Sequence, residues 1–302
     1  MTAGVVSLAE VAATWRPEPT ETSGRIDAGP AVAFAGLLDV PRPAAADGDP
    51  LPPLWHWLYL LDRPAAAEIG PDGHPLAGPF LPPLPERRRM FVGGSLQVDA
   101  PIRVGSVLTR RSEVVRVEAK SGGTGEMLFV RVRDSYTCAG ERLMVEERQL
   151  MYRSGSAAGP PAAAPSSGEP AAVDAPWQFR FAPDPVALFR FSALTYNAHR
   201  IHYDAAYARE VEGYPDLVVH GPLLALLTLE LPRRHAPDRA VTEFSFQARR
   251  PAFASHRLLV HGAPGGIAGV DGVDGVDLTV TTSDAPAAMT AKATLGPATG
   301  TP

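Results

Sequence analysis

Alternating hydrophobic and polar positions dominate two long stretches of the chain and predict antiparallel β-strands in each. The first stretch begins near Met90 and the second near Thr242, and Gly- and Pro-rich turns divide both of them. The expected strands cover residues 95–100, 107–119, 126–136, 141–153, 242–248, 257–261, 277–282 and 289–295. Each half of the chain is therefore expected to carry its own sheet.

A segment that is hydrophobic on almost every side precedes each group of strands. Pro222–Leu231 (PLLALLTLEL) and, nearly as completely, Leu54–Leu61 (LWHWLYLL) lack the broad polar face of a surface helix. A helix of this kind fits inside a curved sheet that covers it on all sides. Further helices are expected from Ser7, an N-cap, to about Arg25, over 28–38 and over 184–193.

Low-complexity sequence separates the two halves. Residues 154–176 consist mainly of Ala, Gly, Pro and Ser, which predicts a linker. We therefore predict an α+β fold with two domains, residues 1–153 and 177–302, each an antiparallel sheet wrapped round a buried helix. This is the double hot-dog arrangement, and the repeated order of helix and sheet indicates an internal duplication.

Composition and charge exclude several classes of function. The net charge of −5 and the pI near 5.9 argue against a nucleic-acid partner. The only cysteine, Cys138, rules out an internal disulfide, fits a reducing compartment and is expected to pack as a small apolar residue. The N-terminal segment lacks the basic region of a signal peptide, and no hydrophobic run approaches the roughly 20 residues that span a bilayer. A cytoplasmic protein without a membrane partner is expected.

Candidate chemistry is concentrated between Phe191 and Glu230. Three histidines, His199, His202 and His220, lie there beside Asn197, and Gly221 then opens the buried segment. Polar side chains directly before a helix, together with the free N–H donors of its first turn, can polarise a thioester. No comparable set of residues lies ahead of Leu54, so we expect the site to belong to the second half.

Phe191–Leu224 resembles the signature of MaoC-like, R-specific enoyl-thioester hydratases. The closest resemblance is to their double hot-dog subgroup, which includes mesaconyl-C4-CoA and itaconyl-CoA hydratases and a mitochondrial hydroxyacyl-thioester dehydratase. The first half also resembles that subgroup, in the segments 70–75 (GPDGHP), 80–83 (FLPP), 88–94 (RRMFVGG) and 101–105 (PIRVG). The resemblance implies a hydro-lyase without a cofactor, acting on an acyl-CoA or acyl-carrier-protein thioester.

The resemblance also implies roles for individual residues. His202 falls on the catalytic histidine of the family, Asn197 on the position usually held by an aspartate, and His199 on a position usually held by asparagine. An amide cannot give up or take a proton near neutral pH, so Asn197 is expected to position water or substrate.

Hydration of an enoyl thioester needs a base for the water, donors for the enolate oxygen and an acid for the α-carbon. We expect His202 to be the base, because an unperturbed imidazole titrates near neutral pH. Its imidazolium, or a water that relays its proton, could serve as the acid. We expect the Gly221 N–H to stabilise the oxygen at the positive end of the helix, with Pro222 at the first helical position and His220 lining the pocket.

The candidate histidines and arginines also have simpler, structural interpretations. His199 and His220 could each be structural hydrogen-bonding residues, and His199 with His202 has the spacing of a helical metal pair. No metal is expected, because the sequence shows no Cys or acidic third ligand. The run Arg87–Arg89 is either a solvated turn or, like Arg249 and Arg250, a binding site for carboxylate or phosphate. Arg88, Arg89 and Arg249 are the substrate-binding candidates.

The favoured reaction is reversible hydration of a branched C5 dicarboxylic enoyl-CoA, mesaconyl-C4-CoA or itaconyl-CoA giving citramalyl-CoA. The main alternative is a 3-hydroxyacyl-thioester dehydratase for fatty-acyl or polyketide-like chains. A hot-dog thioesterase and a non-catalytic acyl-thioester binding protein are alternatives from other classes. Because a fused double hot dog makes its own pseudo-dimer, either a monomer or a homodimer is expected.

Overall fold

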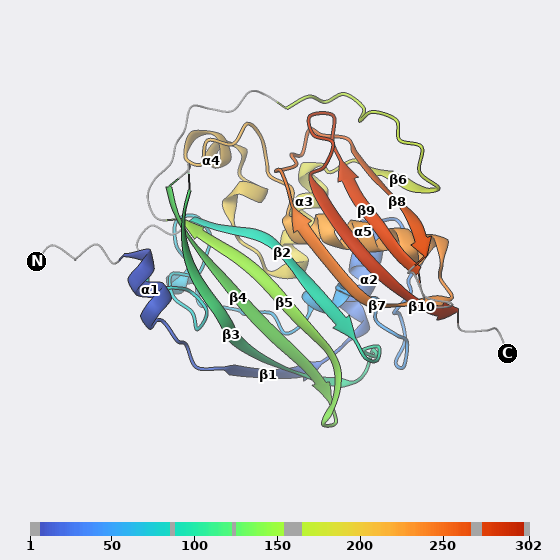
Figure 1. Cartoon of the computed structure of the whole chain (residues 1–302), viewed down its shortest axis with the longest axis horizontal. Helices are drawn as coiled ribbons and strands as arrows, with labels where there is room; N and C mark the ends of the chain where they lie inside the picture. The colour runs from blue at the N-terminus through green and yellow to red at the C-terminus, as the bar shows by residue number, and fades with distance from the viewer. Residues whose placement is uncertain (1–6, 85–87, 123–124, 154–164, 267–273, 299–302) are drawn as a thin grey trace, which may run out of the picture.

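Ten antiparallel strands form one continuous sheet in the computed structural model, which describes residues 7–84, 88–122, 125–153, 165–266 and 274–298 (Figure 1). Their order is β1-β3-β4-β5-β2-β7-β10-β9-β8-β6. The strands are β1 (Thr20–Arg25), β2 (Arg88–Val98), β3 (Val107–Gly122), β4 (Gly125–Cys138), β5 (Glu141–Arg153), β6 (Trp177–Phe181), β7 (Arg239–Ala248), β8 (Leu258–Gly266), β9 (Asp274–Thr281) and β10 (Met289–Ala298).

The two halves of the sheet repeat one topology. The first five strands in sequence have the spatial order 1-3-4-5-2 from one edge inward, and the last five repeat that order from the opposite edge inward. Strands β2 and β7 pair antiparallel at the seam, with Ser95 opposite Ser245. This symmetry supports the predicted internal duplication and the double hot-dog fold.

One buried helix crosses the second half of the sheet. Helix α5 (Gly221–His235) is buried at every position from Leu223 to Pro232, as its hydrophobic pattern predicts. In Figure 1 the larger helices lie behind the sheet. The other helical elements are α1 (Leu8–Thr14), α2 (Ala28–Leu37), η1 (Trp55–Leu58), η2 (Ala66–Glu68), α3 (Pro185–Thr195), η3 (Arg200–His202) and α4 (Ala205–Glu210).

The first half lacks the corresponding long helix, so that prediction was wrong for residues 54–61. Only the single 3-10 turn η1 forms there, although Trp55 and Leu58 are buried. Leu54 and Leu60 both adopt positive φ angles, which breaks the run at each end. With Pro53 and Pro64 as flanking residues, the segment is too short to nucleate a helix on its own.

The N-terminal helix is also shorter than expected. Ser7 caps α1 by accepting a hydrogen bond from the Glu10 N–H (3.0 Å), as predicted, but the helix ends at Thr14. Thr20–Arg25 forms the edge strand β1, because the prolines at 17 and 19 stop helical continuation and Thr-rich sequence favours a strand. Strand β6 was not expected. The other predicted helices and strands are present with ends shifted by several residues.

Two features of the sequence fall partly outside the described residues. They are the first part of the expected linker, residues 154–164, and residues 267–273 of the Gly-Val-Asp repeat at 265–275, which the sequence predicts to be the tip of a hairpin. The division of the chain into domains at residues 154–176 stays a prediction.

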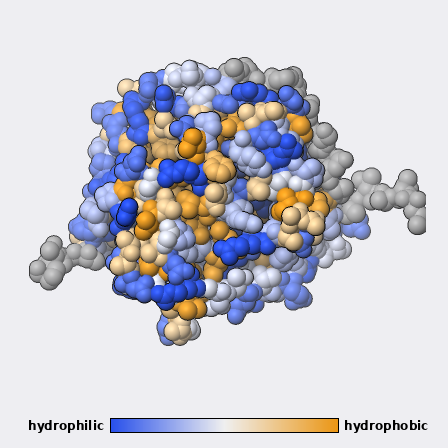
Figure 2. Space-filling model, turned by 180° about the vertical axis from the view of Figure 1, so that it is seen from behind, coloured by the Kyte–Doolittle hydropathy of each residue, from blue (hydrophilic) through white to orange (hydrophobic). Residues whose placement is uncertain are grey.

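The surface opposite the view of Figure 1 is a mosaic, in which hydrophobic patches are separated by hydrophilic residues (Figure 2). Beneath the surface, the main hydrophobic cluster includes α5, α2 and the inner faces of strands from both halves. A second cluster lies between α1 and the first-half strands. Among the described residues, no helix is long and apolar enough to cross a bilayer.

Candidate active site

His202 lies at the end of η3 with its ring almost fully buried. Its Nδ1 donates a hydrogen bond to the Val218 carbonyl oxygen (2.7 Å), which leaves Nε2 with a lone pair. Burial lowers the pKa of His202 to about 4, assisted by the charges of His74 and Arg89 and opposed by the Val218 carbonyl. His202 is therefore a neutral base at neutral pH, rather than a group that titrates near 6.5.

His220 forms a platform beneath His202. The two rings stack with centroids 3.6 Å apart, and His220 is fully buried at the N-cap of α5. Its Nε2 lies 2.9 Å from the Ser192 hydroxyl oxygen, while its Nδ1 is buried without a partner among the described residues. Burial, and then the neighbouring His202, hold the pKa of His220 well below its usual value. A neutral, fixed ring keeps His202 in place without adding charge.

Gly221 opens α5 directly beside these histidines, followed by Pro222. The first N–H groups of a helix have no partner within the helix and face the positive end of its dipole. A Cβ atom on Gly221 would lie 2.8 Å from Cδ1 of Phe91, which comes from strand β2 of the first half. A side chain at position 221 would therefore have to displace the Phe91 ring, so glycine permits a close contact between the halves here.

Asn197 shapes the turn that carries His199. Helix α3 ends at Tyr196, which has a φ of 51°, and the chain then turns sharply. The Asn197 side-chain oxygen accepts a hydrogen bond from the His199 N–H (3.0 Å), so part of its hydrogen-bonding capacity serves the backbone. The His199 ring stands edge-on to His202 with centroids 5.5 Å apart. Burial, followed by His74 and His202, lowers the pKa of His199 to about 2.

A loop of the first half, the domain expected to be non-catalytic and to form a wall of the substrate pocket, lies directly against these second-half residues. Gly73 has a φ of +89°, and a Cβ there would lie 1.7 Å from the Ala198 carbonyl oxygen. The Arg200 N–H donates to the Asp72 carbonyl (2.9 Å), and the Arg200 guanidinium donates to the Pro71 carbonyl (3.1 Å). The loop is therefore seated on the turn between Asn197 and His202.

Asp72 and His74 are the site residues that the sequence reasoning missed. His74 places its Nδ1 3.0 Å from one Asp72 carboxylate oxygen and donates its backbone N–H to the other (2.9 Å). Its ring lies 3.9 Å from the His199 ring, centroid to centroid. Burial alone would raise the pKa of Asp72, but the His74 hydrogen bonds outweigh it and lower that pKa to about 2. Burial lowers the pKa of His74.

The same loop supplies the acidic residue that the sequence seemed to lack for a metal. Ligand atoms of Asp72, His74 and His199 all lie within 4.8 Å of one another, a set that could hold a divalent cation. The hydrogen bonds between Asp72 and His74 already engage part of that set. The sequence signal was the GPDGHP segment, in which Gly and Pro surround an Asp and a His.

The candidate arginines lie in different surroundings. Arg88 pairs with the Glu212 carboxylate and donates to the Glu212 carbonyl (3.1 Å), so it ties β2 to the loop after α4. Arg89 is exposed, and its charge lowers the pKa values of His74, His199 and His202, which places it within electrostatic reach of them. Arg249 follows β7, is exposed and donates to the Thr290 hydroxyl (3.0 Å). Arg87 lies outside the described residues.

Solved structures share this architecture. A MaoC-like dehydratase superposes with a TM-score of 0.71 at 14% identity, covering 94% of this chain and 98% of that one. HtdX of Mycobacterium tuberculosis gives 0.60 at 16% identity, covering 91% and 99%. A second M. tuberculosis protein, described as a double hotdog fold, gives 0.58 at 16% identity, covering 94% and 97%. These likenesses show that the chain has the double hot-dog fold.

Sequence comparison is more specific. The profile of the hydroxyacyl-thioester dehydratase type 2 family matches residues 54–254. Mesaconyl-C(4)-CoA hydratase of Chloroflexus aurantiacus is 44% identical over 232 residues, 76% of this chain and 81% of that protein. The mitochondrial hydroxyacyl-thioester dehydratase type 2 of Schizosaccharomyces pombe is 43% identical over 82 residues, 26% and 27% of the two chains. The chain belongs to the hydroxyacyl-thioester dehydratase type 2 family and is a hydro-lyase of the hydratase and dehydratase type.

Proposed function

We propose that this chain is a cytoplasmic enzyme that reversibly hydrates a branched C5 dicarboxylic enoyl-CoA, mesaconyl-C4-CoA or itaconyl-CoA, to citramalyl-CoA. The observation that carries the reaction is the placement of His202. Its Nε2 has no hydrogen-bond partner among the described residues, and its ring packs on His220, which directly precedes the first turn of α5. A neutral base beside unengaged helix N–H groups is the arrangement that hydration needs.

The proton and electron steps balance with these groups. With mesaconyl-C4-CoA, whose C=C bond is conjugated to the thioester, His202 Nε2 takes a proton from water, and the resulting hydroxide forms a bond to the β-carbon while the C=C π electrons move to the thioester oxygen. The Gly221 N–H stabilises that oxygen. The His202 imidazolium then returns its proton to the α-carbon, directly or through water, and the carbonyl re-forms. His202 ends neutral, and dehydration follows the same steps in reverse.

The choice of substrate rests on the C. aurantiacus relative, whose name states that it acts on mesaconyl-C(4)-CoA. The competing substrate is a 3-hydroxyacyl chain on CoA or an acyl carrier protein, which the family description and the S. pombe relative favour. Arg89, exposed and close to the histidines, is available for an anionic group of either carrier. Initial rates on mesaconyl-C4-CoA, crotonyl-CoA and a longer enoyl-CoA separate the two candidates.

The decisive measurement is loss of absorbance at the enoyl-thioester band with this panel. His202→Ala is expected to lower kcat by about 10²–10⁴-fold, the range typical of a lost general base. His261→Ala is the matched control, because His261 lies on β8 with its Nε2 at 3.0 Å from the Thr281 hydroxyl. A wild-type enzyme that consumes none of the thioesters contradicts the function, and a fully active His202→Ala variant contradicts the mechanism.

The assembly that carries the site is proposed to be a monomer or a homodimer. The seam between β2 and β7 already joins the two halves within one chain, as a dimer interface would. Size-exclusion chromatography with light scattering distinguishes the two states.

A further inference from the structure

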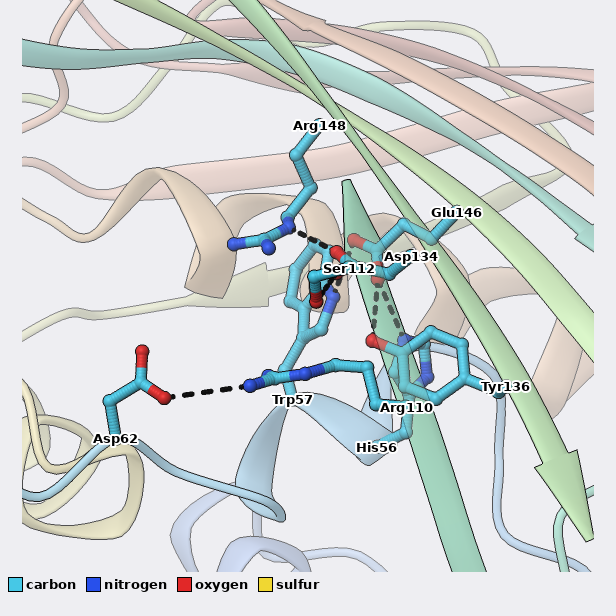
Figure 3. Close-up of polar contacts among 9 residues, drawn as sticks. All are labelled: His56, Trp57, Asp62, Arg110, Ser112, Asp134, Tyr136, Glu146 and Arg148. Carbon is cyan, nitrogen blue, oxygen red and sulfur yellow. Dashed lines mark hydrogen bonds and ion pairs between the residues drawn. The ribbon is translucent and has the colours of Figure 1, made fainter. Parts of the chain in front are cut away.

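A row of buried polar side chains interrupts the hydrophobic interior of the first half. Ser112 on β3 lies opposite Asp134 on β4, which lies opposite Glu146 on β5, and their exposures are 2%, 0% and 1%. Figure 3 shows this cluster beneath the strands. Replacing buried ionic groups by hydrophobic ones is often neutral or stabilising. A contribution to folding stability is therefore a weak explanation for these buried polar side chains.

The two carboxylates of the cluster are well supplied with donors. Glu146 accepts hydrogen bonds from the His56 Nε2 (3.0 Å), the Trp57 indole N–H (2.7 Å) and the Tyr136 hydroxyl (3.1 Å). Asp134 accepts from the Ser112 hydroxyl and from the Arg148 Nε (2.7 Å). Neither carboxylate needs a further partner.

The two guanidinium groups, in contrast, have donors to spare. Arg148 engages only its Nε within the part of the chain that the structure describes, and 31% of its side chain is exposed. Arg110 reaches Asp62 at 3.5 Å, but Asp62 is 87% exposed, and the Arg110 Nε is buried without an acceptor among the described residues. Both guanidinium groups point away from Glu146 toward the same side of the cluster (Figure 3).

The cluster adjoins the candidate active site through aromatic residues. Phe91, whose ring lies against Gly221, is opposite Leu150 on β5, and Arg148 is two residues before Leu150 on the same face. The Trp57 ring, hydrogen-bonded to Glu146, lies 6.1 Å from the Phe91 ring, centroid to centroid. Phe91 and Trp57 therefore link Gly221 to the cluster that holds Arg148.

We propose that Arg148, with Arg110 behind it, binds the free carboxylate of the substrate's acyl group. A guanidinium fork with two unengaged N–H groups matches a carboxylate in geometry and charge. A long aliphatic chain would instead have to lie against Arg148 and the buried carboxylates, which is unfavourable. The proposal rests on the proposed hydratase function and assigns its substrate selectivity to the first half.

The test compares two thioesters that differ only at this group. In 3-methylcrotonyl-CoA a methyl group replaces the free carboxylate of mesaconyl-C4-CoA. Arg148→Gln is expected to lower kcat/KM for mesaconyl-C4-CoA by about 10–100-fold, the loss typical of a charged hydrogen bond, and to change kcat/KM for the methyl analogue by less than threefold. Arg110→Gln is expected to act in the same direction, more weakly. Arg133→Gln, on the opposite face of β4, is the matched control.

Folding is checked separately, because Arg148→Gln leaves Asp134 with only Ser112 as a partner. The double variant Arg148→Gln/Asp134→Asn removes that unpaired charge, and Arg110→Gln breaks an ion pair with the exposed Asp62. Binding of succinyl-CoA against butyryl-CoA by calorimetry gives a readout that does not depend on turnover. Wild type is expected to prefer succinyl-CoA, and the Arg148 variants are expected to lose the preference.

Several results would overturn the proposal. One is an equal loss on both thioesters in the folded double variant, which marks the cluster as purely structural. Another is a loss of selectivity in Arg89→Gln but not in the Arg148 variants, which would show that Arg89 binds the carboxylate instead of Arg148. Hydratase activity that survives in either case leaves the proposed function standing. If wild type has no activity, the binding preference alone decides whether Arg148 receives a carboxylate.

Discussion

The two halves of this molecule share one strand order but differ where each sheet covers its centre. In the second half the fifteen residues of α5 fill that place with hydrophobic side chains. In the first half the four-residue turn η1 occupies the corresponding position in the chain, and the buried row Ser112, Asp134 and Glu146 faces it. Among the described residues, only the second half therefore has the buried helix whose first turn we propose as the source of oxyanion donors.

The difference shows how a duplicated fold can divide the work of one site. The second half supplies His202, His220 and the start of α5. The first half, which has only the short turn η1 in place of a long helix, supplies the Asp72–His74 loop and the Phe91 ring. Both contact residues of the second half. The site lies between unequal halves, so perturbations of either half should reach it.

The largest effect is expected from Gly73→Ala, because its Cβ would collide with the Ala198 backbone and displace the loop. We expect kcat/KM to fall by about 100-fold or more, since misplacements of about 1 Å can cost that much. Gly48→Ala is the matched control, because Gly48 has a φ of +90° but open space around it. Similar losses of kcat/KM in both variants would show that strain at a positive φ angle, and not the contact between the halves, causes the effect.

Acid sensitivity of folding should follow the site histidines. The pKa of His202 is about 4 in the folded protein, below the value near 6.5 in the unfolded chain, so stability falls as the pH drops from 6.5 toward 4. At pH 5 the loss from this residue is ~2 kcal/mol. Urea denaturation at pH 7.5, 6 and 5 measures this loss, and His202→Gln should reduce the slope of the unfolding free energy against pH. An identical slope in both proteins would contradict the burial argument.

A smaller effect is expected from Gly221→Ala, which forces the flexible Phe91 ring to move rather than the backbone. We expect kcat to fall about tenfold, because the helix N–H groups lose their alignment with the thioester oxygen. Adding Phe91→Leu should restore part of the rate, with Phe91→Leu alone as the control. If Phe91→Leu restores none of the kcat of Gly221→Ala, the contact between Gly221 and Phe91 is not the cause of the loss.

The smallest effect is expected from Asn197→Asp, because the Asn197 side-chain oxygen accepts a hydrogen bond from the His199 N–H, which a carboxylate can also accept. The rate should stay within about tenfold of wild type, well short of the roughly 100-fold minimum expected when a general base is lost. The enoyl-thioester absorbance assay measures this, with His202→Ala for comparison. A loss as large as that of His202→Ala would contradict a positioning role for Asn197.

Much of the fold could be predicted from local pattern. Alternation in residues 107–153 and 242–295 predicts the long strands, and the uniformly hydrophobic Pro222–Leu231 predicts the buried helix, because burial on one or all sides leaves that pattern in the sequence. The same reasoning was wrong for Leu54–Leu61, where the hydrophobic run is buried as a short turn. A hydrophobic pattern reports burial more reliably than it reports helix length.

The sequence by itself determined the double hot-dog class, and its motif singled out His202, Asn197 and Gly221 as candidates, all between residues 197 and 221. Only the tertiary structure decided that Asp72 and His74 join His199, and that the Phe91 ring contacts Gly221. In each case the residues come from different halves of the chain, and no local pattern encodes which loop docks on which turn. Packing of the two halves across β2 and β7 makes that choice.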